Sequence, residues 1–273
     1  MKIFLVSLFF AITLAASAQE KVEEFEQFEI RSYTPQKSGV KDLVFEVRID
    51  DMTEMLNKNL VLGKLVDVYY KVFWISPSSF KVEVYGLPKG FDELKADLIA
   101  LIKNRLEFVL PEKFSDKFKG YTLKSESTAD GKLIHAIDAT YTMAIPEIDI
   151  TMDKSGKLKT VQTRSLMSAI KTEFAHSPKS WSGNKLVLDK VISTSKQGAA
   201  LLTNINTIDY VSVNGVGFPS KITVKDVSTF TIPKNEKTKE KKVTNEKVTV
   251  IHFAKYEVNT GKAQGYLYDG QKR

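Results

Sequence analysis

Most of the chain after residue 40 alternates between apolar and polar residues, as strands do when they bury one face. Residues 42–50 alternate cleanly, whereas residues 64–75 carry large apolar groups on both faces. A strand of the second kind is covered on both sides, or is covered on one side and lines a cavity on the other. Turn dipeptides such as Asn214-Gly215 separate successive runs. The pattern predicts about ten to twelve strands in hairpin order, and therefore an antiparallel sheet.

One long segment, residues 91–110, has the apolar spacing of a helix instead. Asp92 and Glu93 place negative charge in its first turn, where the helix dipole favours it, and Pro111 is expected to end it. Its apolar face is formed by Leu94, Leu98, Leu101, Ile102, Leu106 and Val109. Because that face must be buried, we expect a mainly β fold of the α+β class: a curved antiparallel sheet or incomplete β-barrel covered by this helix.

The remaining segments give weaker signals. Residues 19–40 predict either a short N-terminal helix or a loose arm, and residues 112–118 predict a second short helix. The lysine-rich stretch 234–247 is expected to be a solvated loop, and residues 265–269 are expected to add a last edge strand. Since no linker divides the chain, residues 19–273 are expected to form a single domain.

The N-terminus has the pattern of a cleaved export signal. Lys2 is followed by an apolar run over residues 3–14 and by the small-x-small sequence at 16–18. The apolar run is too short to span a bilayer comfortably, so we expect residues 1–18 to be a signal peptide that is cleaved after Ala18.

Cysteine content and charge refine this expectation. An exported protein of this size from an animal or fungus usually carries disulfides, whereas this chain has no cysteine. Its absence beside an export signal predicts a protein of the bacterial cell envelope that resides in the periplasm. The net charge of +7 could attract anionic lipid headgroups or an acidic partner, but much of the excess lies in the 234–247 stretch. We expect no binding to nucleic acid, because no recognisable binding module is present.

The sequence contains no signature of an enzyme or of a metal site. The only histidines are His135, His176 and His252, and none has a partner at metal-ligand spacing. Glu147 and Asp149 lie two apart, so they share one face of a strand and do not oppose each other across a cleft, as glycosidase carboxylates do. We therefore expect a protein that is not an enzyme, with no catalytic residues, no metal and no cofactor.

Aromatic residues concentrate in the predicted hairpin that precedes the helix. They are Tyr69, Tyr70, Phe73, Trp74, Phe80 and Tyr85. Two interpretations remain open: an ordinary core between the sheet and the helix, or an apolar concavity whose bound ligand is also apolar.

Two parts of the chain carry a resemblance to a known family. The first comprises VKDLVFEVRI at 40–49 and GKLVDVYYKVFWISPSSFKVEVYGLP at 63–88, a strand followed by a glycine-led hairpin. The second comprises DYVSVNGVGFPSKITVKD at 209–226 and VTVIHFAKYEV at 248–258. With the export signal, these stretches resemble the LolA/LolB superfamily of periplasmic lipoprotein and lipid carriers. Arg48 lies on the polar face of its strand, so it is not assigned the role of the arginine that keeps the family's cover closed.

The resemblance implies a function and a set of partners. It implies a monomeric LolA-like carrier that takes part in lipoprotein transport, binds a lipid or an acylated protein without chemistry, and meets partners at the inner and outer membranes. The expected cavity between sheet and helix is lined by Phe45, Val47, Val72, Trp74, Val84, Leu94, Leu98, Leu101, Ile102 and Leu106.

Two other functions remain open. The main alternative is a structural or interaction module of the envelope, with a solid core and no ligand cavity. A secreted hydrolase is the third, and it would need polar groups that converge in a cleft. A cavity of several hundred Å³ favours the carrier, because sites for small molecules have roughly 300–1,000 Å³.

Overall fold

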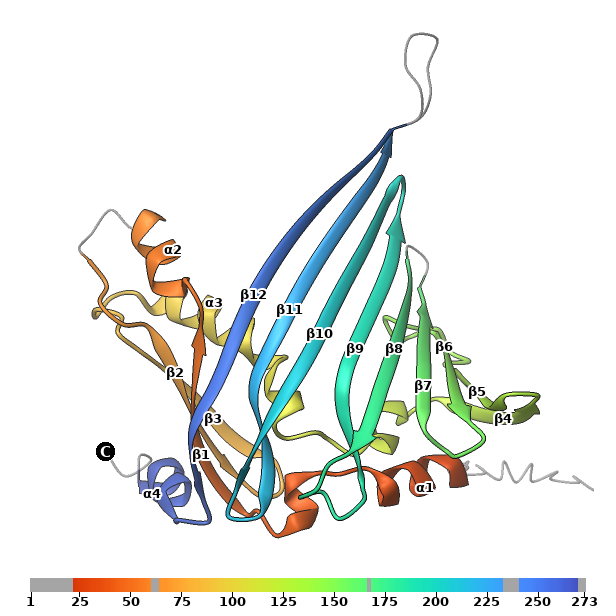
Figure 1. Ribbon diagram of the computed structural model, residues 1–273, viewed down its shortest axis with the longest axis horizontal. Helices are drawn as coiled ribbons and strands as arrows, with labels where there is room; N and C mark the ends of the chain where they lie inside the picture. The colour runs from red at the N-terminus through yellow and green to blue at the C-terminus, as the bar shows by residue number, and fades with distance from the viewer. Residues whose placement is uncertain (1–21, 60–63, 166–167, 233–240, 270–273) are drawn as a thin grey trace, which may run out of the picture.

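The computed structural model of the chain describes residues 22–59, 64–165, 168–232 and 241–269. They form one curved, twelve-stranded antiparallel sheet with the strand order β3-β2-β1-β12-β11-β10-β9-β8-β7-β6-β5-β4 (Figure 1). The expected mainly β fold with a helical cover is thus confirmed. The two edges, β3 and β4, do not pair in the described sheet, so it is not a closed barrel.

The strands include short ones at both edges and long ones in the centre. They are β1 (Asp42–Ile49), β2 (Tyr69–Ile75), β3 (Ser79–Tyr85), β4 (Thr122–Thr128), β5 (Gly131–Ile137), β6 (Glu147–Asp153), β7 (Leu158–Arg164), β8 (Ala169–Pro178), β9 (Leu186–Gln197), β10 (Ala200–Val213), β11 (Val216–Ile232) and β12 (Lys241–Val258). The helices are α1 (Glu23–Arg31), α2 (Met52–Asn59), α3 (Asp92–Lys103) and α4 (Lys262–Asp269), with the 3₁₀ turns η1 (Pro35–Ser38), η2 (Leu106–Phe108) and η3 (Ser115–Phe118).

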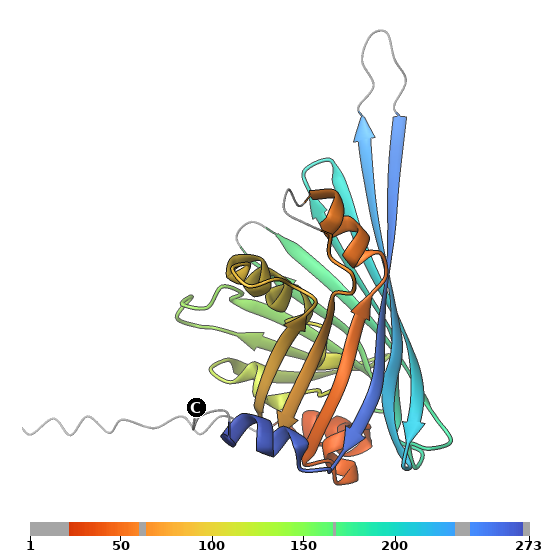
Figure 2. The ribbon, with the colours of Figure 1, turned by 90° about the vertical axis from the view of Figure 1, so that its left-hand side faces the viewer.

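The chain crosses the concave side of the sheet once, from one edge to the other. Strands β4 to β12 pair in sequence order, and β12 then pairs with β1, which continues to β2 and β3. Residues 86–121 therefore have to connect β3 at one edge with β4 at the opposite edge. In Figure 1, α3 and the chain after it lie behind the long strands β10–β12, and Figure 2 shows α3 on the inner side of the curved sheet. We call residues 104–121, which follow α3, the crossing segment.

Two hydrophobic cores lie on the concave side. The first packs α3 against β1–β3 and β10–β12, and includes Phe45, Val47, Trp74, Leu98, Ile102, Leu106, Phe218 and Ile251. The second packs α1 and η3 against β4–β7, and includes Phe25, Phe28, Phe118, Ile134, Ile150 and Leu158. Of the two alternatives predicted for residues 19–40, the short N-terminal helix is the one present. It is α1, which lies across the lower ends of the strands (Figure 1).

The expected helix at 91–110 is shorter in the structure. The regular helix α3 covers Asp92–Lys103, and the chain then continues as the tighter 3₁₀ turn η2. Asn104, a poor helix former, follows the last helical residue. Leu106 and Val109 remain buried, so the apolar face is kept although the winding changes. Likewise, the second helix expected at 112–118 is only the turn η3.

The last edge strand expected at 265–269 is wrong, because this segment is the helix α4. Its first turn is capped by Asp42, whose carboxylate accepts hydrogen bonds from the backbone N–H groups of Gly261 (3.1 Å) and Gln264 (2.9 Å). The ring of Tyr266 stacks on Phe73 with centroids 3.9 Å apart. This contact covers the outer face of β2, so both faces of that strand are covered, as its sequence predicts.

The expectation of a loop at 234–247 is wrong for its second half. Lys241–Val258 form β12, and residues 241–252 pair with β11 in a continuous register. The Lys225–Glu246 ion pair (2.8 Å) joins the two strands, which extend far beyond the helices in Figure 2. Residues 234–240 and the predicted signal peptide, residues 1–18, lie outside the described residues. Among the described helices, none has the length and apolar content needed to cross a membrane.

Candidate functional site

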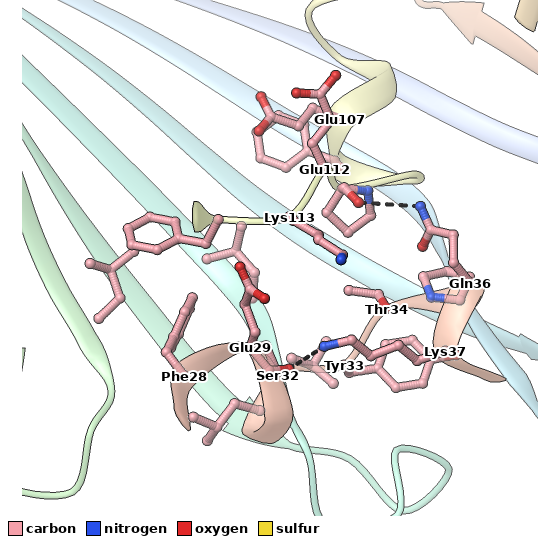
Figure 3. Close-up of a pocket in the computed structure, with 18 of the residues that line it drawn as sticks. Phe28, Glu29, Ser32, Tyr33, Thr34, Gln36, Lys37, Glu107, Glu112 and Lys113 are labelled. Atoms are coloured by element: carbon pink, nitrogen blue, oxygen red, sulfur yellow. Dashed lines mark hydrogen bonds between the residues drawn. The ribbon is translucent and has the colours of Figure 1, made fainter. Parts of the chain in front are cut away.

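A cavity of about 800 Å³ lies between the two hydrophobic cores. Its walls come from α1 and η1, from the crossing segment, and from the concave faces of β7–β10. Its apolar lining includes Phe28, Pro35, Phe108, Phe114, Phe118, Leu158, Val161, Phe174, Leu188 and Tyr210. Figure 3 shows its lining side chains from α1, η1 and the crossing segment. The cavity is large and mostly apolar, so it suits a ligand with an extended apolar part.

Aromatic rings form the wall where the crossing segment meets α1. The ring of Phe114 lies edge-on to Phe25 (centroids 5.0 Å apart) and to Phe28 (5.3 Å), and it also contacts Phe118 (5.1 Å). Such rings bury large apolar areas and hold their neighbours in defined orientations. The crossing segment is therefore packed against α1 at this end of the cavity.

His176 on β8 places a neutral imidazole in the same wall. Its ring lies between those of Phe28 (5.8 Å) and Phe174 (6.3 Å). Burial lowers the pKa of His176 to about 4, against the opposing effect of Asp189, so the ring is uncharged near neutral pH. An uncharged imidazole can share an apolar site without the cost of a buried charge.

Two hydrogen bonds hold the crossing segment to the N-terminal elements in front of the cavity. A carboxylate oxygen of Glu29 accepts the backbone N–H of Ser115 at 2.8 Å. Nε2 of Gln36 donates to the carbonyl of Pro111 at 3.2 Å, and this second bond is drawn in Figure 3. Among the described residues, Oγ of Ser32 and Oε1 of Gln36, which are buried on the same wall, have no hydrogen-bond partner. An unpaired buried polar atom costs about 1–3 kcal/mol, so these two oxygens make the closed wall less stable.

The back of the N-terminal wall is fastened to the sheet. The hydroxyl of Tyr33 accepts the N–H of Gly217 (2.7 Å) and donates to the carbonyl of the same residue (3.2 Å). A Cβ at position 217 would lie 2.1 Å from the ring of Trp181, so only glycine lets Tyr33 and Trp181 pack there. The wall formed by α1 and η1 is thus anchored to β11 through Tyr33. On its other side, two hydrogen bonds join it to the crossing segment.

Beyond the cavity, the concave face becomes polar. Arg105 of the crossing segment donates to Oδ1 of Asn206 (2.7 Å), Asn206 donates to Asn204 (2.6 Å), and Asn204 donates to Asp226 (2.6 Å). A second hollow of about 360 Å³ lies here over β8–β11. The hydroxyls of Thr172, which lines the first cavity, and Ser193, which lines the second, are 3.0 Å apart, so the two spaces adjoin.

The residues expected to line a ligand cavity lie elsewhere. Seven of them are buried in the first core: Phe45, Val47, Val72, Trp74, Leu98, Ile102 and Leu106. Val84 and Leu94 pack against that core, and Leu101 is 59% exposed. None of the ten lines the cavity. The expected position of the cavity is corrected accordingly: it lies beyond the end of α3, and the space between α3 and the hairpin is filled by side chains.

The residues that do line the cavity gave only faint sequence signals. Phe28 belongs to the short apolar face noted in residues 19–40. Phe114 and Phe118 fall in the short segment expected to be a second helix, and Phe174 and His176 lie in a stretch without clear alternation. Most of these lining residues are phenylalanines in segments that the sequence does not predict to form part of the hydrophobic core.

Comparisons with known proteins do not place the chain in a family. No family model matches the sequence, and searches of curated proteins and of solved structures find no match either. Within the ranges that the structure describes, no group of three or more His, Asp or Glu side chains is arranged to hold a metal ion.

Proposed function

We propose that the protein is a carrier that binds the acyl chain of a lipid or of an acylated protein, without chemistry. The observation that supports this proposal is the apolar cavity of about 800 Å³ between the two cores. Phenylalanine rings and aliphatic side chains line most of it, and the imidazole within it is uncharged. Such a surface offers dispersion contacts and removal of apolar area from water, which an acyl chain can use along its whole length.

The energy available from such a site is sufficient without specific polar contacts. Each buried CH₂ group contributes ~0.8 kcal/mol, so burial of about ten would contribute ~8 kcal/mol before the costs of association are subtracted. The proposed setting is the periplasm of a bacterium, where a LolA-like monomer would take its ligand at one membrane and release it at another.

Uptake of a chain requires the cavity to open. The wall between the N-terminal elements and the crossing segment is the proposed opening, because two hydrogen bonds close it and its buried Ser32 and Gln36 oxygens have no partner among the residues that the structure describes. The helix α3 serves instead as a fixed part of the first core. The cover that moves is thus the crossing segment after α3, on this proposal.

A second candidate is a structural module of the cell envelope. The solid first core favours this candidate. In that core the side chains of β1–β3 pack against α3, and none of the ten residues that the sequence predicts as a ligand site lines the cavity. The two candidates differ in whether the cavity of about 800 Å³ takes up an apolar ligand, and this difference can be measured.

The test is a binding titration with delipidated protein and a fluorescent fatty acid. Val161→Trp places a large ring in the cavity and is expected to lower the affinity at least tenfold. Val248→Trp, on the outer face of β12 where Val248 is 58% exposed, is the matched control and should bind as the unaltered protein does. Saturable binding that Val161→Trp leaves unchanged, with both variants folded by circular dichroism, would rule out this cavity as the site.

A further inference from the structure

Two lysine side chains extend into the open part of the cavity from opposite walls. Lys37 belongs to η1 and Lys113 to the crossing segment, and both line the cavity. Figure 3 shows their amino groups reaching into the space between the two walls, beside the carboxylate of Glu29. An apolar cavity therefore ends in a pair of cationic groups.

Neither lysine has a carboxylate partner within ion-pair distance among the described residues. The amino group of Lys37 donates a hydrogen bond to the main-chain carbonyl of Glu29, which is a neutral acceptor. The amino group of Lys113 has no hydrogen bond or ion pair with any residue in the described part of the chain, where only its main-chain carbonyl is engaged, by the N–H of Asp116. Two lysines close by in the sequence differ in this respect, since Lys117 pairs with Glu107 and Lys119 pairs with Asp116.

The acidic residues of the cavity offset only part of the charge of the two lysines. The Glu107 and Asp116 carboxylates are paired with other lysines, whereas the Glu29 carboxylate, which accepts the backbone N–H of Ser115, also attracts the Lys37 ammonium group. Glu112 also lines the cavity, but Figure 3 shows its side chain and that of Glu107 on the far side of the crossing segment from the two amino groups. Against the two ammonium groups Glu29 supplies a single negative charge, so positive charge is in excess at this end of the cavity.

The pKa of Lys37 reflects burial first, and the charged groups around it act in both directions. Burial lowers the pKa of Lys37, and repulsion from Lys185 and Lys113 lowers it further, while Glu29 acts in the opposite direction. A bound anion would relieve this repulsion and would supply the ion pairs that the two ammonium groups lack.

We propose that Lys37 and Lys113 form the head-group site of the carrier and bind the carboxylate or phosphate of an anionic single-chain amphiphile. The tail of this ligand lies among the phenylalanine rings and its anionic end lies between the two ammonium groups. This assignment rests on the proposed function, because it takes the acyl chain in the cavity as given. It narrows the ligand class from any acyl chain to one with a free anionic end.

The test compares two ligands that differ only in the charge of the head group. Delipidated protein is titrated with oleate and with oleyl alcohol by calorimetry at neutral pH and low salt. Because two exposed ion pairs are gained, oleate is expected to bind about tenfold more tightly than oleyl alcohol, and salt should reduce this preference. The double variant Lys37→Gln/Lys113→Gln should bind both ligands with the affinity of the alcohol.

The matched control is Lys89→Gln/Lys124→Gln, which removes the same net charge at two exposed lysines that do not line the cavity. It should keep the preference for oleate. Equal affinities of the unaltered protein for oleate and the alcohol would overturn the head-group site but leave the carrier intact, since both ligands bind. Binding of inorganic phosphate alone as tightly as oleate would also overturn it. If neither ligand binds, the carrier function fails as well.

Discussion

The guanidinium group of Arg105 donates a hydrogen bond to the side-chain oxygen of Asn206 across 2.7 Å. Arg105 lies on the crossing segment just after α3, and Asn206 lies in the middle of β10, only 3% exposed. The bond joins the segment that roofs the cavity to the sheet that forms its floor. It also starts the polar chain that continues through Asn204 to Asp226.

Replacing Arg105 with alanine should therefore loosen the roof. The change leaves the buried oxygen of Asn206 without its donor, so we expect the free energy of unfolding to fall by about 1–3 kcal/mol. We also expect bound fatty acid to exchange faster, which stopped-flow fluorescence measures. Lys103→Ala, at an exposed neighbour on α3, is the control and should change neither quantity. An unchanged exchange rate in Arg105→Ala would show that this bond does not hold the roof.

Two leucines on α3 should respond very differently to the same substitution. Leu98 is buried in the first core, so Leu98→Ala should lower the free energy of unfolding by about 2–5 kcal/mol in a denaturant titration. Leu101 is 59% exposed, so Leu101→Ala should change it by no more than about 0.5 kcal/mol. Because neither residue lines the cavity, the affinity for fatty acid should stay the same in both variants. A large loss of affinity in Leu98→Ala would indicate that the ligand binds between α3 and the sheet, and not in the cavity beyond α3.

The buried histidine predicts a particular dependence of stability on pH. In the folded protein burial lowers the pKa of His176 to about 4, whereas an unfolded chain has a histidine pKa of about 6.5. Between these values the unfolded chain binds more protons than the folded one, so stability falls as the pH falls from about 6.5 to about 4. The loss from this residue is at most about 3 kcal/mol.

His176→Gln removes the titrating group, so its unfolding free energy should decline less steeply over the same pH range. Denaturant titrations at several pH values between 4 and 7.5 measure both slopes. Identical slopes in the two proteins would mean that His176 titrates normally in the folded state.

The cap on α4 gives a local prediction. Asp42→Ala removes the acceptor of two backbone N–H groups at the start of the helix, which should cost about 1–2 kcal/mol. Amide hydrogen exchange should rise in residues 262–269 before it rises elsewhere. Asp42→Asn keeps one acceptor oxygen and should lose less. Exchange that rises equally across the whole sheet would argue against a local cap.

The antiparallel sheet could be predicted from the sequence because strands and hairpins depend on residues that are close together in the chain. Alternation in runs such as 42–50, and turn dipeptides such as Asn214-Gly215, set the faces and hairpins of neighbouring strands. Asn214 and Gly215 both have positive φ, 52° and 80°, as a two-residue hairpin turn with this sequence requires. The apolar face of α3 likewise predicted a cover on the sheet.

What the sequence did not reveal depends on contacts between distant residues. The carboxylate of Asp42 caps a helix more than 200 positions away, so the local pattern of residues 265–269 could not show it. The cavity has the same origin. Phe28, Phe114 and Phe174 meet only because the chain crosses from one edge of the sheet to the other, and no local spacing records that meeting. The aromatic hairpin at 64–85 is the clearer signal, but its rings do not line the cavity: Tyr70 and Trp74 fill the first core, Phe73 packs against α4, and Phe80 and Tyr85 are exposed.

On the proposed function, the cavity between the two cores holds an acyl chain. The most direct measurement is native mass spectrometry of the protein purified without detergent from its own cells, followed by organic extraction of whatever it carries. We predict an adduct with the mass of an acyl-chain amphiphile, present in the unaltered protein and depleted in Val161→Trp. A protein that carries no such adduct, and that also fails to take up added fatty acid, would contradict the carrier function.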